Sequence, residues 1–137
     1  MLKCTFSDVS ERDMDLLFLE EFVCSQEFLN IFLSKIDLLN ATICSVEHSK
    51  VDVEFGESDL TIIVEKDGQR YGLLIEDKID AIAMKNQSDR YLKRGENDKN
   101  KGDYSNYFVF IVAPEKYIQT NEEAKKYRYK VTYEECI

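Results

Sequence analysis

Two acidic residues and a lysine, Asp59, Glu76 and Lys78, form the clearest candidate for a reactive site in this sequence. Asp59 and Glu76 fall on two predicted strands joined by a tight turn, and the register of that hairpin sets them directly opposite each other. Lys78 follows Glu76 by two residues, so it projects from the same face of the strand. Two carboxylates this close repel each other unless a cation lies between them. The three residues predict a site for a divalent metal ion; a charge cluster neutralised by Lys78 alone is the alternative.

The register follows from the turn. Asp67-Gly68 is among the strongest short-range signals for a two-residue hairpin loop. With these two residues as the loop, Lys66 faces Gln69, and the pairing continues outward to the two carboxylates. The opposite face of the hairpin is apolar throughout, and we assign it to the core: Leu60, Ile62, Val64, Tyr71, Leu73 and Ile75.

A carboxylate pair with a nearby lysine suits the hydrolysis of a phosphate ester. Mg²⁺ and similar hard ions prefer oxygen ligands, take few of them from protein and keep water in the remaining positions. A lysine beside the metal-bound water can orient or deprotonate that water and offset charge on the phosphate. The hairpin alone is compatible both with such a metal site and with a charge cluster at a strand end.

The elements that must position this hairpin are predicted from periodicity. Apolar residues at helical spacing predict helices over 11–24 and 26–36, with a capping box at Ser10 and a cap at Ser25. A strand should run from about 43 to 55 and end in a turn at 56–58. After the hairpin we expect a polar helix at about 83–94, a charged stretch at 95–103, a buried strand at 107–113, a helix near 121–126 and a last strand at 127–133.

This order, ααβββαβαβ, indicates a mixed sheet flanked by helices, and hence an α/β or α+β fold. A length of 137 residues indicates a single domain over 1–137. No stretch approaches the roughly 18 apolar residues of a membrane helix, and the amino terminus lacks the apolar core of a signal peptide. We therefore expect no membrane partner. The four cysteines form no C-x-x-C pair and only His48 could join them, so we expect reduced thiols and a cytoplasmic location.

The charge is distributed unevenly along the chain. A formal net charge of −9 argues against a general nucleic-acid coat protein, which would normally be basic. The segment 85–101 nevertheless holds six basic and three acidic residues, a net charge of +3. A solvated helix face is the ordinary explanation of such a run, and a surface for phosphate contacts is the other.

The hairpin and the helix after it resemble the PD-(D/E)XK nuclease superfamily. Its signature is an acidic residue that opens one strand and an E-x-K on the next, matched here by Asp59 and by Glu76-Asp77-Lys78. Many members add a Q-x-x-x-Y motif on the following helix, matched by Gln87 and Tyr91, which share a helix face. The resemblance spans about residues 10–133.

Members also carry an acidic residue on the first helix, for which Glu11 is our choice, ahead of Glu20 and Glu21. The chain departs from the family in two ways. Ser58 replaces the proline that commonly precedes the first acidic residue, and the chain stops at Ile137, where relatives often continue. We expect either a minimal domain or a fragment truncated at its carboxyl terminus.

The resemblance implies a restriction-endonuclease-like fold and a metal-dependent deoxyribonuclease. Mg²⁺ or Mn²⁺ would be bound by Asp59, Glu76 and the backbone carbonyl of Asp77, while Lys78 positions the attacking water. Gln87 would brace the site or touch the phosphate, and Tyr91 would pack behind it. Three basic residues of the helix would contact the nucleic-acid backbone: Arg90, Lys93 and Arg94.

Other functions remain open at this stage. The substrate is expected to be DNA, but RNA would use the same residues. Because the chain is acidic, a homodimer or a partner protein could supply basic surface. A non-catalytic nucleic-acid-binding or assembly domain of the same fold is one alternative, and an unrelated α/β interaction domain with incidental charges is another.

Overall fold

The computed structural model describes residues 11–52, 56–77 and 87–136, and the side chains of 16–48, 60–77 and 88–136. Two helices come first, α1 (Glu11–Cys24) and α2 (Gln26–Leu33), followed by the 3-10 turn Ser34–Ile36. Three strands follow: β1 (Thr42–Asp52), β2 (Gly56–Lys66) and β3 (Gln69–Asp77). The second half contains α3 (Gln87–Asn100), β4 (Asn106–Ala113), α4 (Glu115–Thr120), α5 (Glu122–Lys125), β5 (Tyr129–Thr132) and the 3-10 turn Glu134–Cys136.

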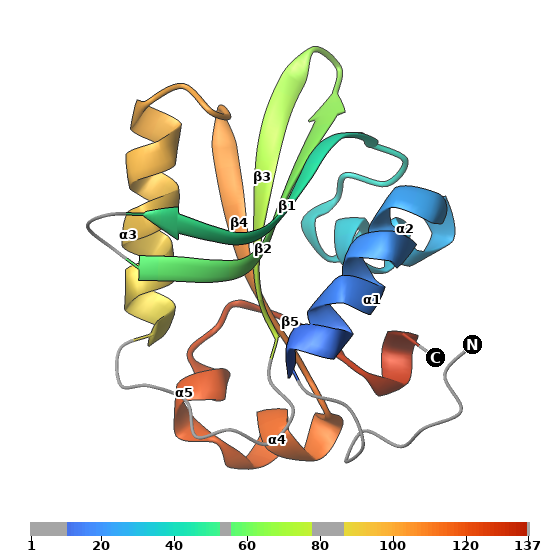
Figure 1. Cartoon of the computed structure of the whole chain (residues 1–137), viewed down its shortest axis with the longest axis vertical. Helices are drawn as coiled ribbons and strands as arrows, with labels where there is room; N and C mark the ends of the chain where they lie inside the picture. Colours follow the sequence, from blue (N-terminus) through green and yellow to red (C-terminus); the bar gives the residue numbers. More distant parts are fainter. Residues whose placement is uncertain (1–10, 53–55, 78–86, 137) are drawn as a thin grey trace.

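The strands form one mixed sheet in the order β1-β2-β3-β4-β5. Strands β1, β2 and β3 are antiparallel neighbours, whereas β4 runs parallel to both β3 and β5. Helices α1 and α2 lie on one side of this sheet and α3 on the other, as Figure 1 shows. The expected fold class, a mixed sheet flanked by helices, is confirmed.

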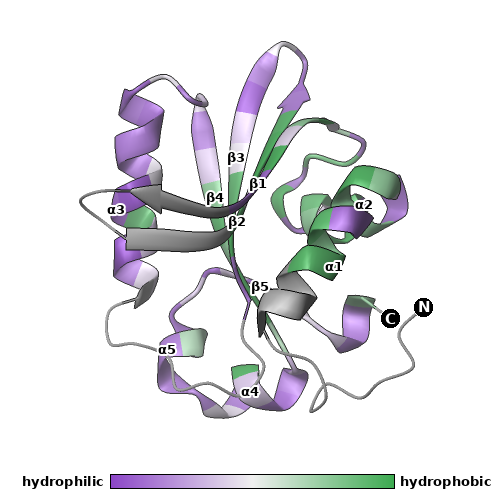
Figure 2. Cartoon of the chain, viewed as in Figure 1, coloured by the Kyte–Doolittle hydropathy of each residue, from purple (hydrophilic) through white to green (hydrophobic). Residues whose placement is uncertain are grey.

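Each face of the sheet has its own core. The hairpin face predicted to be apolar packs against α1 and α2, where Leu60, Ile62, Val64, Leu73 and Ile75 are buried and Tyr71 is half-buried. A smaller cluster fills the other face, beneath α3 and α5: Ile63, Leu74, Tyr91, Tyr104, Val109, Ile111, Ala124 and Tyr127. Helix α2 and the inner parts of β3 and β4 are accordingly apolar, whereas α3 is mostly polar (Figure 2).

The predicted hairpin register is confirmed. Lys66 pairs with Gln69, and the ladder continues to Leu60 and Ile75 without a shift. Asp67 and Gly68 both have positive φ, at 53° and 80°. A two-residue turn with two positive φ angles matches the twist of the flanking strands, which is why this dipeptide sets the register.

The two amino-terminal helices also follow the prediction. Both have the expected bounds when the 3-10 turn after α2 is included. The Ser25 hydroxyl accepts a hydrogen bond from the Phe28 amide at 3.1 Å, so Ser25 is the expected cap of α2. The capping box proposed at Ser10 lies outside the described residues.

Two predicted boundaries are wrong or incomplete, and one helix was not predicted. Residues 56–58 are not a turn: they belong to β2 and pair with 50–52 of β1. Helix α3 continues through Gly95 to Asn100 instead of ending at 94, and its expected first residues lie outside the described part. Helix α4 was not predicted, because in its six residues only Ile118 is buried, which leaves no apolar periodicity to detect.

Gly95 lies inside α3 because the helix passes close to β4 there. A Cβ atom at this position would lie 2.3 Å from the Tyr107 ring, which is far inside van der Waals contact. The glycine that suggested a helix end is therefore required by packing. Within the part of the chain that the structure describes, no helix is long and apolar enough to cross a membrane.

Candidate functional site

Glu76 lies at the carboxyl end of β3, on the face of the sheet covered by α3. It is 3% exposed, and its Oε2 atom accepts a hydrogen bond from the Tyr91 hydroxyl. Tyr91 is one turn into α3 and is itself buried. Because both groups are shielded from water, this hydrogen bond fixes the Glu76 carboxylate relative to the helix. Tyr91 was expected to pack behind the site, and it also contacts the site directly.

Asp77 points to the opposite face of the sheet. It is 0% exposed, and its Oδ1 atom accepts a hydrogen bond from the Tyr133 hydroxyl, next to the carboxyl-terminal turn. The Phe18 ring of α1 packs edge-on against Tyr133, with the ring centroids 5.7 Å apart. The side chain of Asp77 is therefore part of the α1 core. Only its backbone carbonyl was assigned to the site, and the structure is compatible with that division.

Asp59 lies in β2, one position beyond Leu60, which pairs with Ile75 at the end of the confirmed register. Continuing that register would set Asp59 across from Glu76. The side chain of Asp59 is not among those described, so its position opposite Glu76 stays a prediction. Glu11 and Gln87 begin α1 and α3, but their side chains are likewise outside the described set, and Lys78 lies outside the described residues altogether.

The other first-helix candidates, Glu20 and Glu21, are exposed on α1. That helix packs on the face of the sheet opposite to Glu76, where Phe18 and Phe22 enter the larger core. Nothing described brings Glu20 or Glu21 to the Glu76 side.

The basic run of α3 is divided between surface and interior. Lys93 is exposed and Arg90 is half-buried, which is compatible with the contacts to a nucleic-acid backbone expected of them. Arg94, in contrast, is 1% exposed. It faces the sheet, because it shares the helix face of Tyr91 and Asp98 at helical spacing, and both are buried. Its burial removes Arg94 from the surface contacts expected from the sequence.

Arg94 belongs to a buried polar group under α3 that includes Asp98 and Tyr104. Burial and then the carboxylates of Asp98 and Asp103 raise the pKa of Tyr104 far above its usual range, while the Arg94 guanidinium opposes them. The Tyr104 hydroxyl donates to the Gly95 carbonyl at 3.2 Å. This group ties α3 to the sheet.

The amino end of α3 is held by a residue that the sequence analysis did not single out. The backbone N–H and the hydroxyl of Ser88 both donate to Oε1 of Glu123, at 3.0 and 3.1 Å. Glu123 belongs to α5, and its other oxygen lies 3.0 Å from the Lys126 ammonium. A carboxylate at a helix amino end is favourable for both its hydrogen bonds and the helix dipole. No local pattern signals this cap, because its two partners lie 35 residues apart.

One carboxylate of the kind that Mg²⁺ prefers lies at the end of β3 among the described residues. The Glu76 carboxylate lies on the α3 face, with the Asp77 carbonyl next to it along the chain. Among the described side chains no group of three or more histidine, cysteine, aspartate or glutamate residues is arranged to bind a metal ion. The set expected from the sequence includes Asp59, whose side chain is outside that search.

Comparisons with family models, with curated proteins and with solved structures give no match to this chain. The assignment of a function therefore rests on the residues of the site and their geometry.

Proposed function

We propose that this protein is a metal-dependent nuclease of the restriction-endonuclease-like class that hydrolyses DNA phosphodiester bonds. The observation that carries the proposal is the hydrogen bond from Tyr91 to Glu76. It joins the strand of the E-x-K sequence to the helix of the Q-x-x-x-Y sequence at one buried point. This contact supports the nuclease over an unrelated fold, in which the two sequence motifs need not meet.

The hairpin register supports the same proposal. It was derived from the Asp67-Gly68 turn alone, and it holds from Lys66 with Gln69 to Leu60 with Ile75. The second carboxylate, Asp59, belongs to the next position of that strand. A mixed sheet with α3 crossing over between parallel β3 and β4 also fits the proposed class.

In this proposal the residues divide the work. Glu76, Asp59 and the Asp77 carbonyl bind Mg²⁺ or Mn²⁺, which when bound lowers the pKa of a water molecule and stabilises charge on the phosphate. Lys78 positions that water and offsets phosphate charge. Tyr91 is a positioning residue, since it holds Glu76 in one orientation.

The test is cleavage of single- and double-stranded DNA at low salt with Mg²⁺ or Mn²⁺. We expect metal-dependent cleavage by the wild type and a loss of at least about 100-fold in Lys78→Ala. Lys116→Ala removes an exposed lysine of α4 to which the proposal gives no role, and it should cleave like the wild type. An RNA substrate of the same sequence establishes whether the activity is limited to DNA.

Mn²⁺ titration separates the remaining outcomes. A site built by the two carboxylates should bind Mn²⁺ far more tightly in the wild type than in Asp59→Ala. Binding without cleavage of any substrate would favour the non-catalytic domain of the same fold. Equal, weak binding in both proteins together with no cleavage would refute the nuclease and leave an incidental charge cluster.

A further inference from the structure

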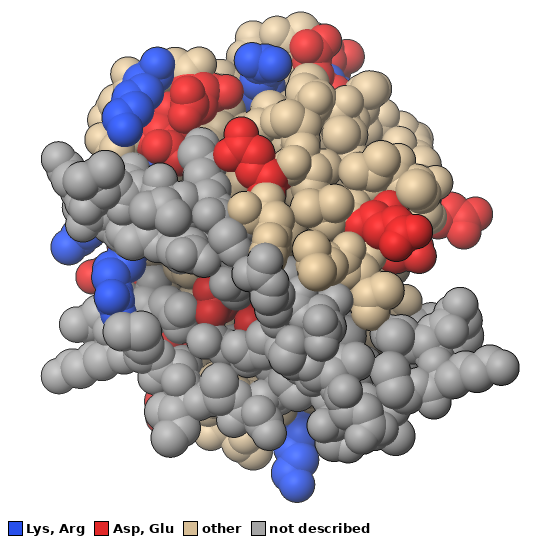
Figure 3. All heavy atoms as spheres, viewed as in Figure 1, with Lys and Arg blue, Asp and Glu red and all other residues tan. Residues whose placement is uncertain are grey.

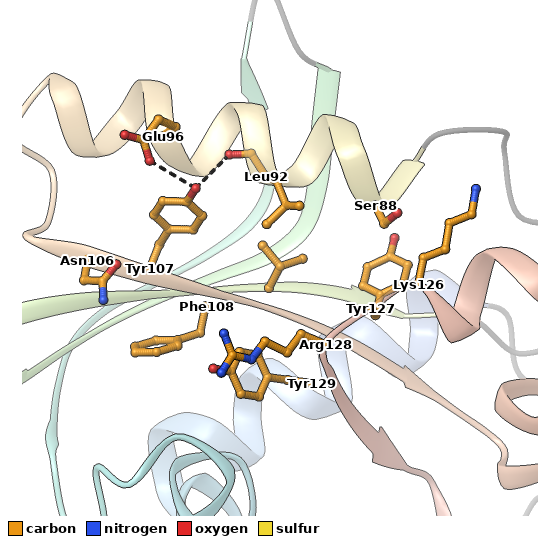
Figure 4. A pocket seen from close by; sticks show the side chains of 11 residues that line it. Ser88, Leu92, Glu96, Asn106, Tyr107, Phe108, Lys126, Tyr127, Arg128 and Tyr129 are labelled. Atoms are coloured by element: carbon orange, nitrogen blue, oxygen red, sulfur yellow. Dashed lines mark hydrogen bonds between the residues drawn. The ribbon is translucent and has the colours of Figure 1, made fainter.

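A pocket of about 310 Å³ opens at the edge of the sheet beside the first half of β4, and Figure 4 shows the side chains around it. This volume lies near the lower end of the roughly 300–1,000 Å³ of small-molecule sites. Strand β5 pairs with β4 only from Phe110 with Tyr129 onward. No described strand therefore pairs with residues 106–109 on that side, and the pocket takes the place where β5 would continue. Backbone donors and acceptors along this edge need other partners.

Aromatic rings border the pocket on both faces of the sheet. Tyr107 and Phe108 are consecutive on β4 and so point to opposite faces. The Tyr107 hydroxyl is anchored by hydrogen bonds to the Leu92 carbonyl at 3.1 Å and to Glu96 at 3.2 Å. Phe108 packs edge-on against Tyr129, with their centroids 5.7 Å apart. A flat ring entering the gap would meet aromatic surface on either side of β4.

Two cations come from the segment between α5 and β5. The Arg128 guanidinium lies 5.3 Å from the centroid of the Tyr129 ring, at the floor of the pocket in Figure 4. Lys126 borders the pocket and is exposed, and its ammonium also lies 3.0 Å from the Glu123 carboxylate. The acidic residue in the lining, Glu96, already accepts the hydrogen bond from Tyr107. The side formed by Lys126 and Arg128 is therefore suited to an anion.

We propose that this pocket binds one nucleotide of a single-stranded nucleic acid, with its base beside the rings of Tyr107 and Phe108 and its phosphate at Arg128 and Lys126. A base supplies both the flat surface and the polar edge that the open β4 backbone can bond. Bases in a duplex are stacked and paired, so they cannot enter. A free nucleotide carries the same chemistry, and the test separates the two sources.

The pocket adjoins the candidate nuclease site through two tyrosines. Tyr127 lines the pocket, and its ring centroid lies 6.2 Å from that of Tyr91, whose hydroxyl reaches Glu76. A strand held by one nucleotide in the pocket would continue past this pair toward the end of β3. The inference deepens the proposed function, on which it rests for its role in cleavage, by naming single strands as the bound form.

The experiment measures binding of a short, fluorescently labelled oligothymidylate by fluorescence anisotropy, at low salt with EDTA present. Lys126→Ala and Arg128→Ala should each weaken binding by at least about fivefold. Lys125→Ala is the matched control, since Lys125 and Lys126 are neighbours that each pair with a glutamate three residues earlier, and only Lys126 lines the pocket. Lys125→Ala should stay within about twofold of the wild type.

Competition identifies the source of the ligand. Displacement of the oligonucleotide by millimolar thymidine monophosphate, but not by duplex DNA, supports a single-nucleotide site. Three results would overturn the proposal: equal losses in Lys125→Ala and Lys126→Ala, duplex bound as tightly as single strand, or stronger competition by a polyglutamate peptide than by nucleotides. The last result would assign the open β4 edge to an acidic peptide.

The two proposals fail separately. Binding is measured without divalent metal, and repeating it in Lys78→Ala removes any contribution of cleavage. A protein that binds the oligonucleotide through Arg128 and does not cleave would refute only the nuclease. A protein that cleaves, and whose binding does not change in Arg128→Ala or Lys126→Ala, would refute only the pocket.

Discussion

At the scale of single residues, two tyrosines hold the end of β3 from opposite faces of the sheet. Tyr91 donates to Glu76 from α3, and Tyr133 donates to Asp77 next to the carboxyl-terminal turn. All four side chains are buried. Consecutive acidic residues thus have different tasks: Glu76 faces the candidate site, whereas Asp77 anchors the strand in the α1 core. A strand end fixed on both sides holds the Glu76 carboxylate in one orientation, which is what the proposed metal site would need.

Removing one hydroxyl tests this anchoring. Tyr91→Phe keeps the ring but leaves the buried Glu76 carboxylate without that donor, so the free energy of unfolding should fall by about 1–3 kcal/mol. Urea denaturation at neutral pH measures the change. Tyr71→Phe is the control: Tyr71 is a half-buried tyrosine of the same sheet, packed on the other face, and its change should stay within about 0.5 kcal/mol. Equal effects of the two variants would show that the hydrogen bond adds no stability.

At the scale of elements, α3 depends on α5 for its amino-terminal cap. Burial by itself would raise the pKa of Glu123, but the hydrogen bonds from the Ser88 amide, from Lys126 and from the Ser88 hydroxyl outweigh it and lower that pKa below its usual 4.5. A lowered folded-state pKa means that the carboxylate stabilises the fold above pH 4.5. This stabilisation is lost as the pH falls through the folded-state pKa.

Glu123→Gln should therefore destabilise the protein in a pH-dependent way. At pH 7 we expect a loss of about 1 kcal/mol in the free energy of unfolding, typical of a helix cap. The difference from the wild type should shrink as the pH falls below 4.5 and through the lowered pKa of Glu123, because the wild-type side chain then also becomes neutral. Urea denaturation of both proteins at a series of pH values from 3 to 7 measures this difference in the free energy of unfolding. Glu122→Gln changes a neighbouring, exposed glutamate and should show neither effect; a pH-independent difference for Glu123→Gln would contradict the cap.

Gly95 gives a second prediction for this element. Gly95→Ala normally favours a helix by about 1 kcal/mol, but here the new methyl group would overlap the Tyr107 ring. We expect a net destabilisation of about 1–3 kcal/mol, measured by urea denaturation. In a Tyr107→Ala background the obstacle is gone, so the same substitution should become neutral or stabilising. A destabilisation of equal size in both backgrounds would place its cause elsewhere.

Sequence patterns predicted the elements where one local signal dominates. The Asp67-Gly68 turn determined the hairpin register, and the cap at Ser25 marked the start of α2. The end of α3 was mispredicted, because Gly95 reads as a helix breaker unless the Tyr107 ring beside it is known. Tertiary packing outweighed local propensity there.

In the candidate site, too, local sequence signals were predictive and contacts between distant residues were not. The hydrogen bond between Tyr91 and Glu76 agrees with the expectation, drawn from the Q-x-x-x-Y motif, that Tyr91 points toward the end of β3. The contact of Tyr133 with Asp77 spans 56 residues, and no spacing rule reports it. Arg94 looked like its neighbour Lys93 in a basic run, yet one faces the sheet and the other solvent. Charge composition alone could not separate them.

At the scale of the whole molecule, the acidic charge opposes the proposed substrate. The net charge is −9, and Figure 3 shows clusters of acidic side chains over the visible face, with fewer basic ones between them. A polyanion approaching this surface is repelled over about a Debye length, so affinity should depend on the few exposed cations of α3 and the α5–β5 segment. Contacts of this kind weaken steeply as salt rises.

The salt dependence of the DNA-binding constant therefore reports how many such contacts form. Its change in a variant shows whether the removed cation makes one of them. Each phosphate contact that is lost should lower the slope of log K against log salt by about 0.7 to 0.9. Lys93→Ala should do so without changing stability, because Lys93 is exposed on α3. Arg94→Ala should do the reverse: its guanidinium is buried under the helix, so we expect a loss of stability and an unchanged slope in the folded fraction. Anisotropy titrations between about 20 and 200 mM salt, paired with thermal melts, measure both quantities. A slope that falls in Arg94→Ala and not in Lys93→Ala would mean that α3 presents its buried face to the nucleic acid, and the arrangement of helix and sheet described above would have to open on binding.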